Sequence, residues 1–281
     1  MKTPRGRRRF HVYFFASCAL PLINASFEPY QLNGGLVTAV AGKDYCVVAS
    51  DTRLSTGYEI YTRRHLTSRL WTAGDDILCG PDGSLVLEEK KISVKTAPIW
   101  IASSGCAADC EALKRIIRFE VRASQHWNTA LLGVNSISSL LSQVLYQRRH
   151  FPYYSFCVVA GLNDGEGAAY VYDAIGSFEQ VAVATAGTGR ELMQPILDRL
   201  FASQHEAEEV MKSSGTATMP RVVETRVRCS AEEAVARLIR GYRSVAERDI
   251  GVGDSVVLCV TQRDENGDTT CRVMSVPLKT H

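Results

Sequence analysis

The residues best suited to metal binding or thiol chemistry in this 281-residue chain are nine cysteines and six histidines. No two cysteines have the Cys-x-x-Cys spacing, and no two histidines have the His-x-x-x-His spacing of a helical zinc site. Cys106 and Cys110 could share a helix face, but two thiolates without further ligands make a poor metal site. The cysteines are irregularly spaced and mostly lie in apolar runs, so we expect buried free thiols, no metal and no cofactor.

Motifs that bind nucleotides or activate a serine are incomplete. Residues 187–189 read Gly-Thr-Gly and lack the third glycine of a dinucleotide fingerprint, and no loop ends in Gly-Lys-Ser or Gly-Lys-Thr. No Gly-x-Ser-x-Gly elbow occurs, so Ser103 and Ser104 are interpreted as ordinary residues at a strand end. The basic pairs at 63–64 and 148–149 lack the interleaved aromatics of a nucleic-acid-binding sheet, and we expect them to pair with acids inside the chain or across an interface.

Composition and charge exclude several classes of protein. The chain has 32 Lys and Arg residues against 30 Asp and Glu, which argues against a nucleic-acid-coating protein. Five of those bases lie within the first nine positions, so the rest of the chain is mildly acidic. With 46% hydrophobic and 22% charged residues, the chain can fill a large core, which excludes disordered and fibrous classes.

Residues 1–26 imitate a secretory signal. Residues 2–9 are basic, residues 12–23 are apolar, and 24–26 are small. An apolar run of this length is too short to span a bilayer, so no membrane association is expected. The odd number of cysteines disfavours an oxidising compartment. A removed leader or propeptide, a disordered extension, an upstream start-site artefact and a true signal therefore all stay open.

From residue 36 onward, groups of strands alternate with pairs of helices. Two apolar runs around a Gly-Lys-Asp turn predict a hairpin over 36–51. Apolar residues at helical spacing predict one helix pair at 106–128 and 136–148 and a second at 190–204 and 230–247. Further strands are expected at 77–80, 98–105, 156–162, 168–174, 178–187, 255–262 and 269–278.

This segregated order indicates an α+β fold rather than an alternating doubly wound sheet. Two stacked antiparallel sheets with a helix pair on each outer face would bury every apolar strand, so we expect a four-layer αββα sandwich. Ser230 followed by Glu233 forms a capping box at the start of the last helix. Residues 27–281 are expected to form a single domain with polar surface insertions near 81–97 and 205–229.

One family resemblance covers roughly residues 27–278. The run NGGLVTAVAGKDYCVVASDTRLSTGY (33–58) resembles the opening hairpin of proteasome beta subunits, which belong to the N-terminal nucleophile hydrolase superfamily. The likeness continues through four later segments, at 145–154, 161–178, 194–198 and 246–254. It is most specific to the beta type-1 subunits, the non-catalytic members at the sixth ring position. Five motifs in the same order make chance an inadequate explanation.

In active members of that family, the hydroxyl of an N-terminal threonine attacks the peptide carbonyl, and its own amine, a lysine and an aspartate assist. The resemblance assigns the nucleophile position to Gly35, which has no hydroxyl. Asp51 matches the aspartate, but the position of the lysine falls at about Thr67, with Arg69 as the nearest cation. An arginine stays protonated and cannot act as the base. The resemblance therefore implies a degenerate site with no catalytic residue.

The rest of the degenerate site keeps a hydroxyl and a carboxylate. Thr188 matches a serine near the nucleophile, and Asp249 matches the family aspartate, whereas the accompanying serine is replaced by Val252. Asp51 and Asp249 are expected to hold loops through hydrogen bonds. Thr38 lies inside the strand without an N-terminal amine, and a strand threonine is ordinarily a packing residue.

The resemblance implies a catalytically silent subunit of the 20S proteasome. Its partners would be the other proteasome alpha and beta subunits, in a hetero-heptameric beta ring within a 28-subunit core. Its part in ubiquitin- and ATP-dependent degradation would be to close the chamber wall and position active neighbours, in the cytoplasm and nucleus. Two alternatives stay open: an active threonine-type peptidase that uses Thr38 or Ser26 after unusual processing, and an exported protein.

Overall fold

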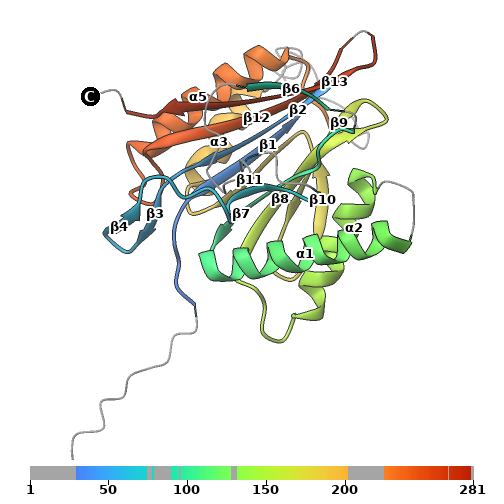
Figure 1. Cartoon of the computed structure of the whole chain (residues 1–281). Coiled ribbons are helices and arrows are strands. Elements are labelled where there is room, and N and C mark those ends of the chain that lie inside the picture. Colours follow the sequence, from blue (N-terminus) through green and yellow to red (C-terminus); the bar gives the residue numbers. More distant parts are fainter. Residues whose placement is uncertain are drawn as a thin grey trace, which may run out of the picture.

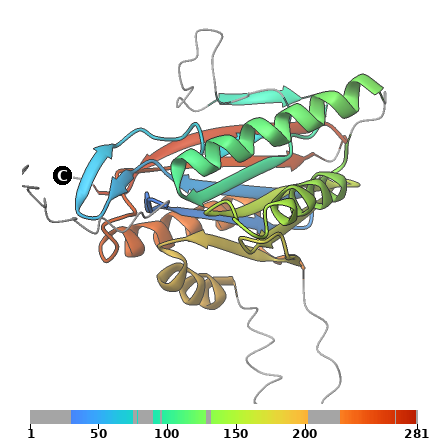
Figure 2. The same ribbon diagram turned by 90° about the horizontal axis from the view of Figure 1, so that it is seen from below.

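Two antiparallel sheets lie face to face in the computed structural model of the chain, and a pair of helices covers each outer side (Figures 1 and 2). The structure describes residues 30–74, 78, 90–94, 96–127, 132–201, 225–264 and 266–279, with only the backbone of 90–94. These four layers confirm the αββα sandwich that the order of elements predicts.

The first sheet has six strands in the order β11-β1-β2-β12-β13-β6. Their bounds are β11 Val183–Gly187, β1 Leu36–Ala41, β2 Tyr45–Asp51, β12 Ser255–Arg263, β13 Thr269–Pro277 and β6 Lys90–Val94. β1 and β2 form the predicted hairpin, with Val37 opposite Ser50 and Ala41 opposite Cys46. Every residue of both strands is buried, because one face meets the second sheet and the other meets helices.

The second sheet has five strands in the order β10-β9-β8-β7-β5. Their bounds are β10 Phe178–Val181, β9 Glu166–Tyr172, β8 Ser155–Asn163, β7 Trp100–Gly105 and β5 Leu70–Thr72. A separate hairpin of β3 (Leu54–Thr56) and β4 (Glu59–Thr62) projects at one end of the sandwich (Figure 1).

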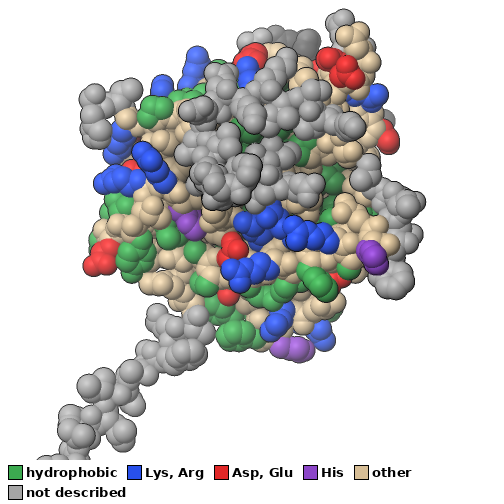
Figure 3. All heavy atoms as spheres, viewed as in Figure 1, with side chains coloured by type: hydrophobic (Ala, Val, Ile, Leu, Met, Phe, Trp, Pro, Cys, Tyr) green, Lys and Arg blue, Asp and Glu red, His purple; other side chains and the backbone are tan. Residues whose placement is uncertain are grey.

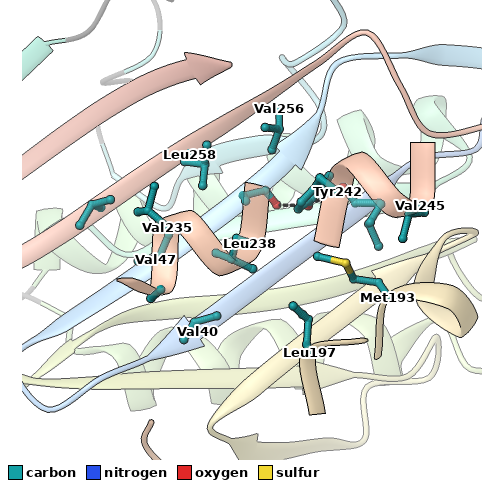
Figure 4. Packing of buried hydrophobic residues seen from close by; sticks show 14 of the residues in the cluster. Val40, Val47, Met193, Leu197, Val235, Leu238, Tyr242, Val245, Val256 and Leu258 are labelled. Atoms are coloured by element: carbon teal, nitrogen blue, oxygen red, sulfur yellow. Dashed lines mark hydrogen bonds between the residues drawn. The ribbon is translucent and has the colours of Figure 1, made fainter. Parts of the chain in front are cut away.

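Each helix pair buries its apolar face on one sheet. Helices α1 (Ala107–Trp127) and α2 (Val134–Gln147) share a cluster of buried residues with the five-stranded sheet. Helices α3 (Arg190–Phe201) and α5 (Ala231–Ala246) cover the six-stranded sheet. Figure 4 shows side chains of α3 and α5 directed toward β1, β2 and β12.

The start of α5 shows the serine half of the predicted capping box, whereas the carboxylate of Glu233 pairs with Arg237. The hydroxyl oxygen of Ser230 accepts a hydrogen bond from the backbone N–H of Glu233 at 3.3 Å. Between the sheets, small and branched apolar side chains form a third cluster. Trp100 of β7 donates its indole N–H to Thr261 Oγ1 of β12 at 2.9 Å, which links the two sheets through the core.

The sequence prediction differs from the structure where strands are short or bend. The strand expected over 178–187 is two strands, and only Ala182 separates β10 in one sheet from β11 in the other. β3, β4 and β5 were not predicted, since three or four residues carry too little alternation to be detected. The strand expected at 77–80 lies outside the described residues, apart from Leu78, which is buried.

Both predicted insertions contribute residues to the fold. β6 falls within 81–97 and pairs with β13, so it extends the six-stranded sheet as its edge strand. In the second insertion, residues 202–224 lie outside the described part, whereas Val227 is buried and donates its backbone N–H to Ala41 at 2.8 Å. The last residues of that insertion therefore belong to the fold and not to an exposed loop.

The described cysteines are free, as expected. Six of them are buried and Cys229 is half-buried, while Cys18 and Cys79 lie outside the described residues. Within the described ranges, no group of His, Cys, Asp and Glu side chains is arranged to hold a metal. None of the helices that the structure describes is both long enough and apolar enough to cross a bilayer.

Candidate functional site

The site predicted from the sequence lies where the chain enters β1. Gly34 and Gly35 both have positive φ angles, +65° and +103°, a conformation that L side chains rarely adopt. A Cβ atom placed on Gly35 would overlap the guanidinium of Arg69. The structure therefore leaves no room for a side chain at the nucleophile position while Arg69 is in place.

Asp51 ends β2 directly beside Gly35 and is fully buried. Its Oδ1 accepts the backbone N–H of Leu36 at 2.9 Å and pairs with Arg69 Nη1 at 2.7 Å. Its Oδ2 lies 3.3 Å from the backbone nitrogen of Gly253. Burial raises the pKa of Asp51 above the ordinary aspartate value, and Arg69 and the backbone N–H groups oppose that shift. The carboxylate thus anchors the chain around Gly35.

Arg69 uses both terminal nitrogens of its guanidinium to hold the neighbouring chain. Besides the ion pair with Asp51, Nη2 donates to the carbonyl of Asn33 at 3.1 Å and to that of Arg53 at 2.6 Å. The side chain is only 4% exposed. Because a guanidinium stays protonated, Arg69 can neutralise Asp51 but cannot accept a proton from a nucleophile.

Thr67, the residue assigned to the lysine position, does not join this cluster. It is exposed, and its carbonyl oxygen accepts a hydrogen bond from Lys114 Nζ at 2.7 Å. The backbone N–H of Arg69 bonds to Leu66 at 2.9 Å, so the chain turns here and directs residue 69 rather than residue 67 toward Asp51. Counting positions along the sequence could not account for this turn.

Thr188 and Asp249 meet on the other side of Gly35. Thr188 Oγ1 lies 3.0 Å from Asp249 Oδ2 and 3.3 Å from the carbonyl oxygen of Gly35. Asp249 Oδ1 accepts the backbone N–H of Gly251 at 2.8 Å. Val252 is fully buried in the core under α5. As expected, Asp249 holds the loop after α5 through hydrogen bonds.

Asn33 lies at the centre of the site, and the sequence analysis did not identify this residue. Its backbone N–H donates to Gly105 at 2.9 Å, and its Oδ1 accepts the backbone N–H of Ala107, in the first turn of α1, at 2.9 Å. Its Nδ2 donates to Thr56 Oγ1 at 3.0 Å. Asn33 thus caps α1 from a distant part of the sequence, and its only sequence signal is a polar residue before two glycines.

The chain just upstream of Asn33 is also held in place. Tyr30 donates its hydroxyl to the carbonyl of Pro152 at 2.7 Å. Its ring stacks on Phe151, with the centroids 5.4 Å apart, and lies 5.3 Å from the ring of Tyr154. Residues 30–34 therefore form part of the folded structure in the unprocessed chain.

Two other hydroxyl groups near the site are packed as structural residues. Thr38 is fully buried, with Oγ1 3.3 Å from the hydroxyl of Tyr242. Ser68 Oγ lies 2.7 Å from His65 Nε2, but Ser68 is 2% exposed. Burial lowers the pKa of His65 to about 4, which keeps its imidazole neutral. Neither hydroxyl is open to a peptide substrate, and Ser26 lies outside the described residues.

The sandwich and the entry of β1 define the class of protein. Two stacked antiparallel sheets between helix pairs, with a site just before an opening hairpin, form the fold of the N-terminal nucleophile hydrolases. The family model described as "Proteasome subunit" matches residues 80–222.

Curated relatives extend the match over most of the chain. "Proteasome subunit beta type-1" of Arabidopsis thaliana is 32% identical over 242 residues, which cover 86% of this chain and 93% of that protein. The protein of the same name from Petunia hybrida is 35% identical over 237 residues, 84% of this chain and 91% of that protein. The one from Dictyostelium discoideum is 34% identical over 249 residues, 88% and 89% of the two chains. The chain belongs to the proteasome beta subunit family.

Proposed function

We propose that this chain is a non-catalytic beta subunit of the 20S proteasome core. The observation that carries the proposal is the pairing of Gly35 with Arg69: the nucleophile position has no hydroxyl, and an arginine fills the space in which one would lie. The subunit would contribute to a threonine-type endopeptidase complex without forming an acyl-enzyme itself.

The loss of chemistry extends beyond the nucleophile. An N-terminal nucleophile also needs a free amine and a tunable base nearby. In this chain, the cation beside Asp51 is a guanidinium, and the bonds of Asn33 hold the peptide upstream of Gly35 in the fold. The absent hydroxyl at Gly35 and the guanidinium beside Asp51 support a silent subunit over an enzyme with a displaced nucleophile.

The partners would be other proteasome alpha and beta subunits. Family membership supports assembly with them, and the relatives named above carry the beta type-1 designation. We propose a place in a hetero-heptameric beta ring within the 28-subunit core, where the chain would close the chamber wall beside active neighbours. The remaining residues of the site would then have a structural role, because the hydrogen bonds of Asp51 and Asp249 organise the chain where it enters β1.

Inhibitor labelling of the assembled particle tests the catalytic part of this proposal. After treatment with a threonine-directed epoxyketone, intact-mass analysis should show adducts on active subunits and an unmodified mass for this chain. The active neighbours serve as the internal positive control. An adduct on this chain at any residue would refute its silence, whereas failure to recover it with other core subunits would refute the structural role.

A cytoplasmic and nuclear location belongs to the same proposal, because core particles assemble there. Residues 1–26 imitate a signal, so they are the part of the chain to test. A fluorescent reporter fused to residues 1–29 should stay out of the secretory pathway. Export of the reporter, with a leaderless reporter retained, would contradict this location.

A further inference from the structure

The turn that follows α2 presents a basic and aromatic surface. Residues 146–151, called the basic turn below, are all exposed, with Tyr146 at 56% and Phe151 at 60%. Arg148, Arg149 and His150 lie between these two rings in the sequence. Figure 3 shows Lys and Arg side chains over α1 and, below it, over this turn.

Neither arginine of the turn is paired with an acid in the part of the chain that the structure describes. Arg148 lies over the ring of Tyr153, with 5.5 Å to the centroid, and Arg149 lies over the ring of Tyr146 at 4.9 Å. The sequence predicted that such basic pairs meet acids within the chain or across an interface. Pairing with acids within the chain is not observed for the described residues, which leaves pairing across an interface.

Hydrogen bonds and ring contacts also hold the turn in place. The backbone N–H of Arg149 bonds to Tyr146 at 3.1 Å, and that of Phe151 bonds to Arg148 at 2.9 Å. Tyr30 stacks on Phe151, and Asp109 of α1 accepts the backbone N–H of Tyr154 at 2.8 Å. Cation–π contacts with the two tyrosines orient the guanidinium groups. A surface fixed in this way loses little conformational entropy when a partner binds.

We propose that the basic turn is a docking surface for an acidic patch on a neighbouring proteasome subunit. The inference rests on the proposed function for the identity of the partner. Exposed Tyr and Arg side chains are the residues most enriched at binding hot spots. Uncompensated positive charge selects a partner surface that carries carboxylates, with which arginine forms bidentate pairs.

Two other occupants fit the turn less well. Residues 1–29 contain five bases in the first nine positions and a single acid, Glu28, so they cannot supply carboxylates to both arginines. Single-stranded nucleic acid needs free aromatic faces for base stacking. Here Arg149 covers one face of Tyr146, and Tyr30 stacks on Phe151. An acidic protein surface uses the arginines and does not need those faces.

Charge reversal is the first test, in cells that also express the wild-type chain and the other core subunits. Arg148→Glu/Arg149→Glu should enter purified core particles roughly tenfold less than the tagged wild type, because each reversed charge would face carboxylates. The matched control, Arg122→Glu/Arg240→Glu, makes the same change at two exposed arginines on helices and should compete normally. Equal incorporation of both variants would overturn the proposal.

Cross-linking without a spacer identifies the partner. In the variants Arg148→Lys and Arg149→Lys, a water-soluble carbodiimide activates a nearby carboxylate, and the lysine amine displaces the resulting urea to form an amide bond. We expect peptides that join residue 148 or 149 to an Asp or Glu of another subunit. Arg122→Lys should not yield a link to the same partner peptide.

The remaining outcomes separate this inference from the proposed function. A cross-link only to Glu28 would show that the chain's own upstream segment occupies the basic turn. Binding of a single-stranded RNA probe that charge reversal abolishes would show that nucleic acid occupies it. Either outcome overturns the inference. Normal incorporation without any intersubunit link also overturns it and leaves the proposed function intact. A wild-type chain absent from core particles would instead refute the proposed function.

Discussion

Arg69 Nη1 lies where the Cβ atom of residue 35 would be, so the arginine and any residue other than glycine at that position exclude each other. The same nitrogen pairs with Asp51 at 2.7 Å. The position that resembles the family nucleophile is thus closed by a buried ion pair. A side chain at residue 35 would require a second change at Arg69, because this arginine both occupies the space and neutralises the charge of Asp51.

Gly35→Thr alone should therefore restore no activity and should destabilise the chain. The positive φ of +103° costs about 1–3 kcal/mol for a residue with a side chain, and the overlap with Arg69 adds to this. Urea unfolding followed by tryptophan fluorescence measures the loss. Gly74→Thr is the matched control, since no atom lies within 4 Å of a Cβ there. Epoxyketone labelling of the substituted residue 35 would contradict the prediction.

Arg69→Met should lower the free energy of unfolding by about 3–5 kcal/mol, because it leaves the Asp51 carboxylate buried without its cation. Burial already raises the pKa of Asp51, so the folded variant should bind a proton more tightly than the unfolded chain does. Its stability should then fall as the pH rises above the unfolded value near 4. Urea unfolding at about pH 4.5 and about pH 7.5 measures this slope.

The matched control for that variant is Arg115→Met. Arg115 is 78% exposed and pairs with Glu111 at 3.2 Å on the surface of α1, an interaction worth less than about 1 kcal/mol. We expect little change in its stability at either pH. If Arg69→Met lost the same stability at both pH values, protonation of Asp51 would not be the cause.

Asn33→Ala should loosen both the first turn of α1 and the chain that enters β1. The change removes the side-chain bonds to Ala107 and Thr56, for which we expect a cost of about 1–2 kcal/mol. Hydrogen exchange should become faster at the amide of Ala107. The first turn of α2, which has no side-chain cap, is the internal control, and equal acceleration there would mean global loosening instead of a lost cap.

Thiol reactivity should follow burial. Burial raises the pKa of Cys46 and Cys157 to about 12 and that of Cys271 to about 11, so few thiolates form near neutral pH. With iodoacetamide at about pH 8, Cys229 should be modified first among the described cysteines, since it alone is half-buried. Peptide mass spectrometry before and after denaturation measures the rates. Modification of Cys46 in the folded chain as fast as Cys229 would contradict this order.

The long elements of the fold were predictable from the sequence alone. The hairpin of β1 and β2, the four helices that the structure describes and the last two strands all follow from apolar patterns over many residues, and Ser230 with Glu233 marks the start of α5. Local patterns of this length carry enough information because each repeats its signal several times. The missing hydroxyl at Gly35 also required only the sequence and its family resemblance.

Only the tertiary structure decided what fills the space beside Gly35. The turn at Leu66 brings Arg69, and not Thr67, to Asp51, and Asn33 caps a helix that begins 74 residues later. β5 and β6 become strands because the edges of existing sheets offer them unpaired backbone groups. Such contacts join residues far apart in the chain, so no local pattern encodes them, and only the packing of the whole sandwich selects them.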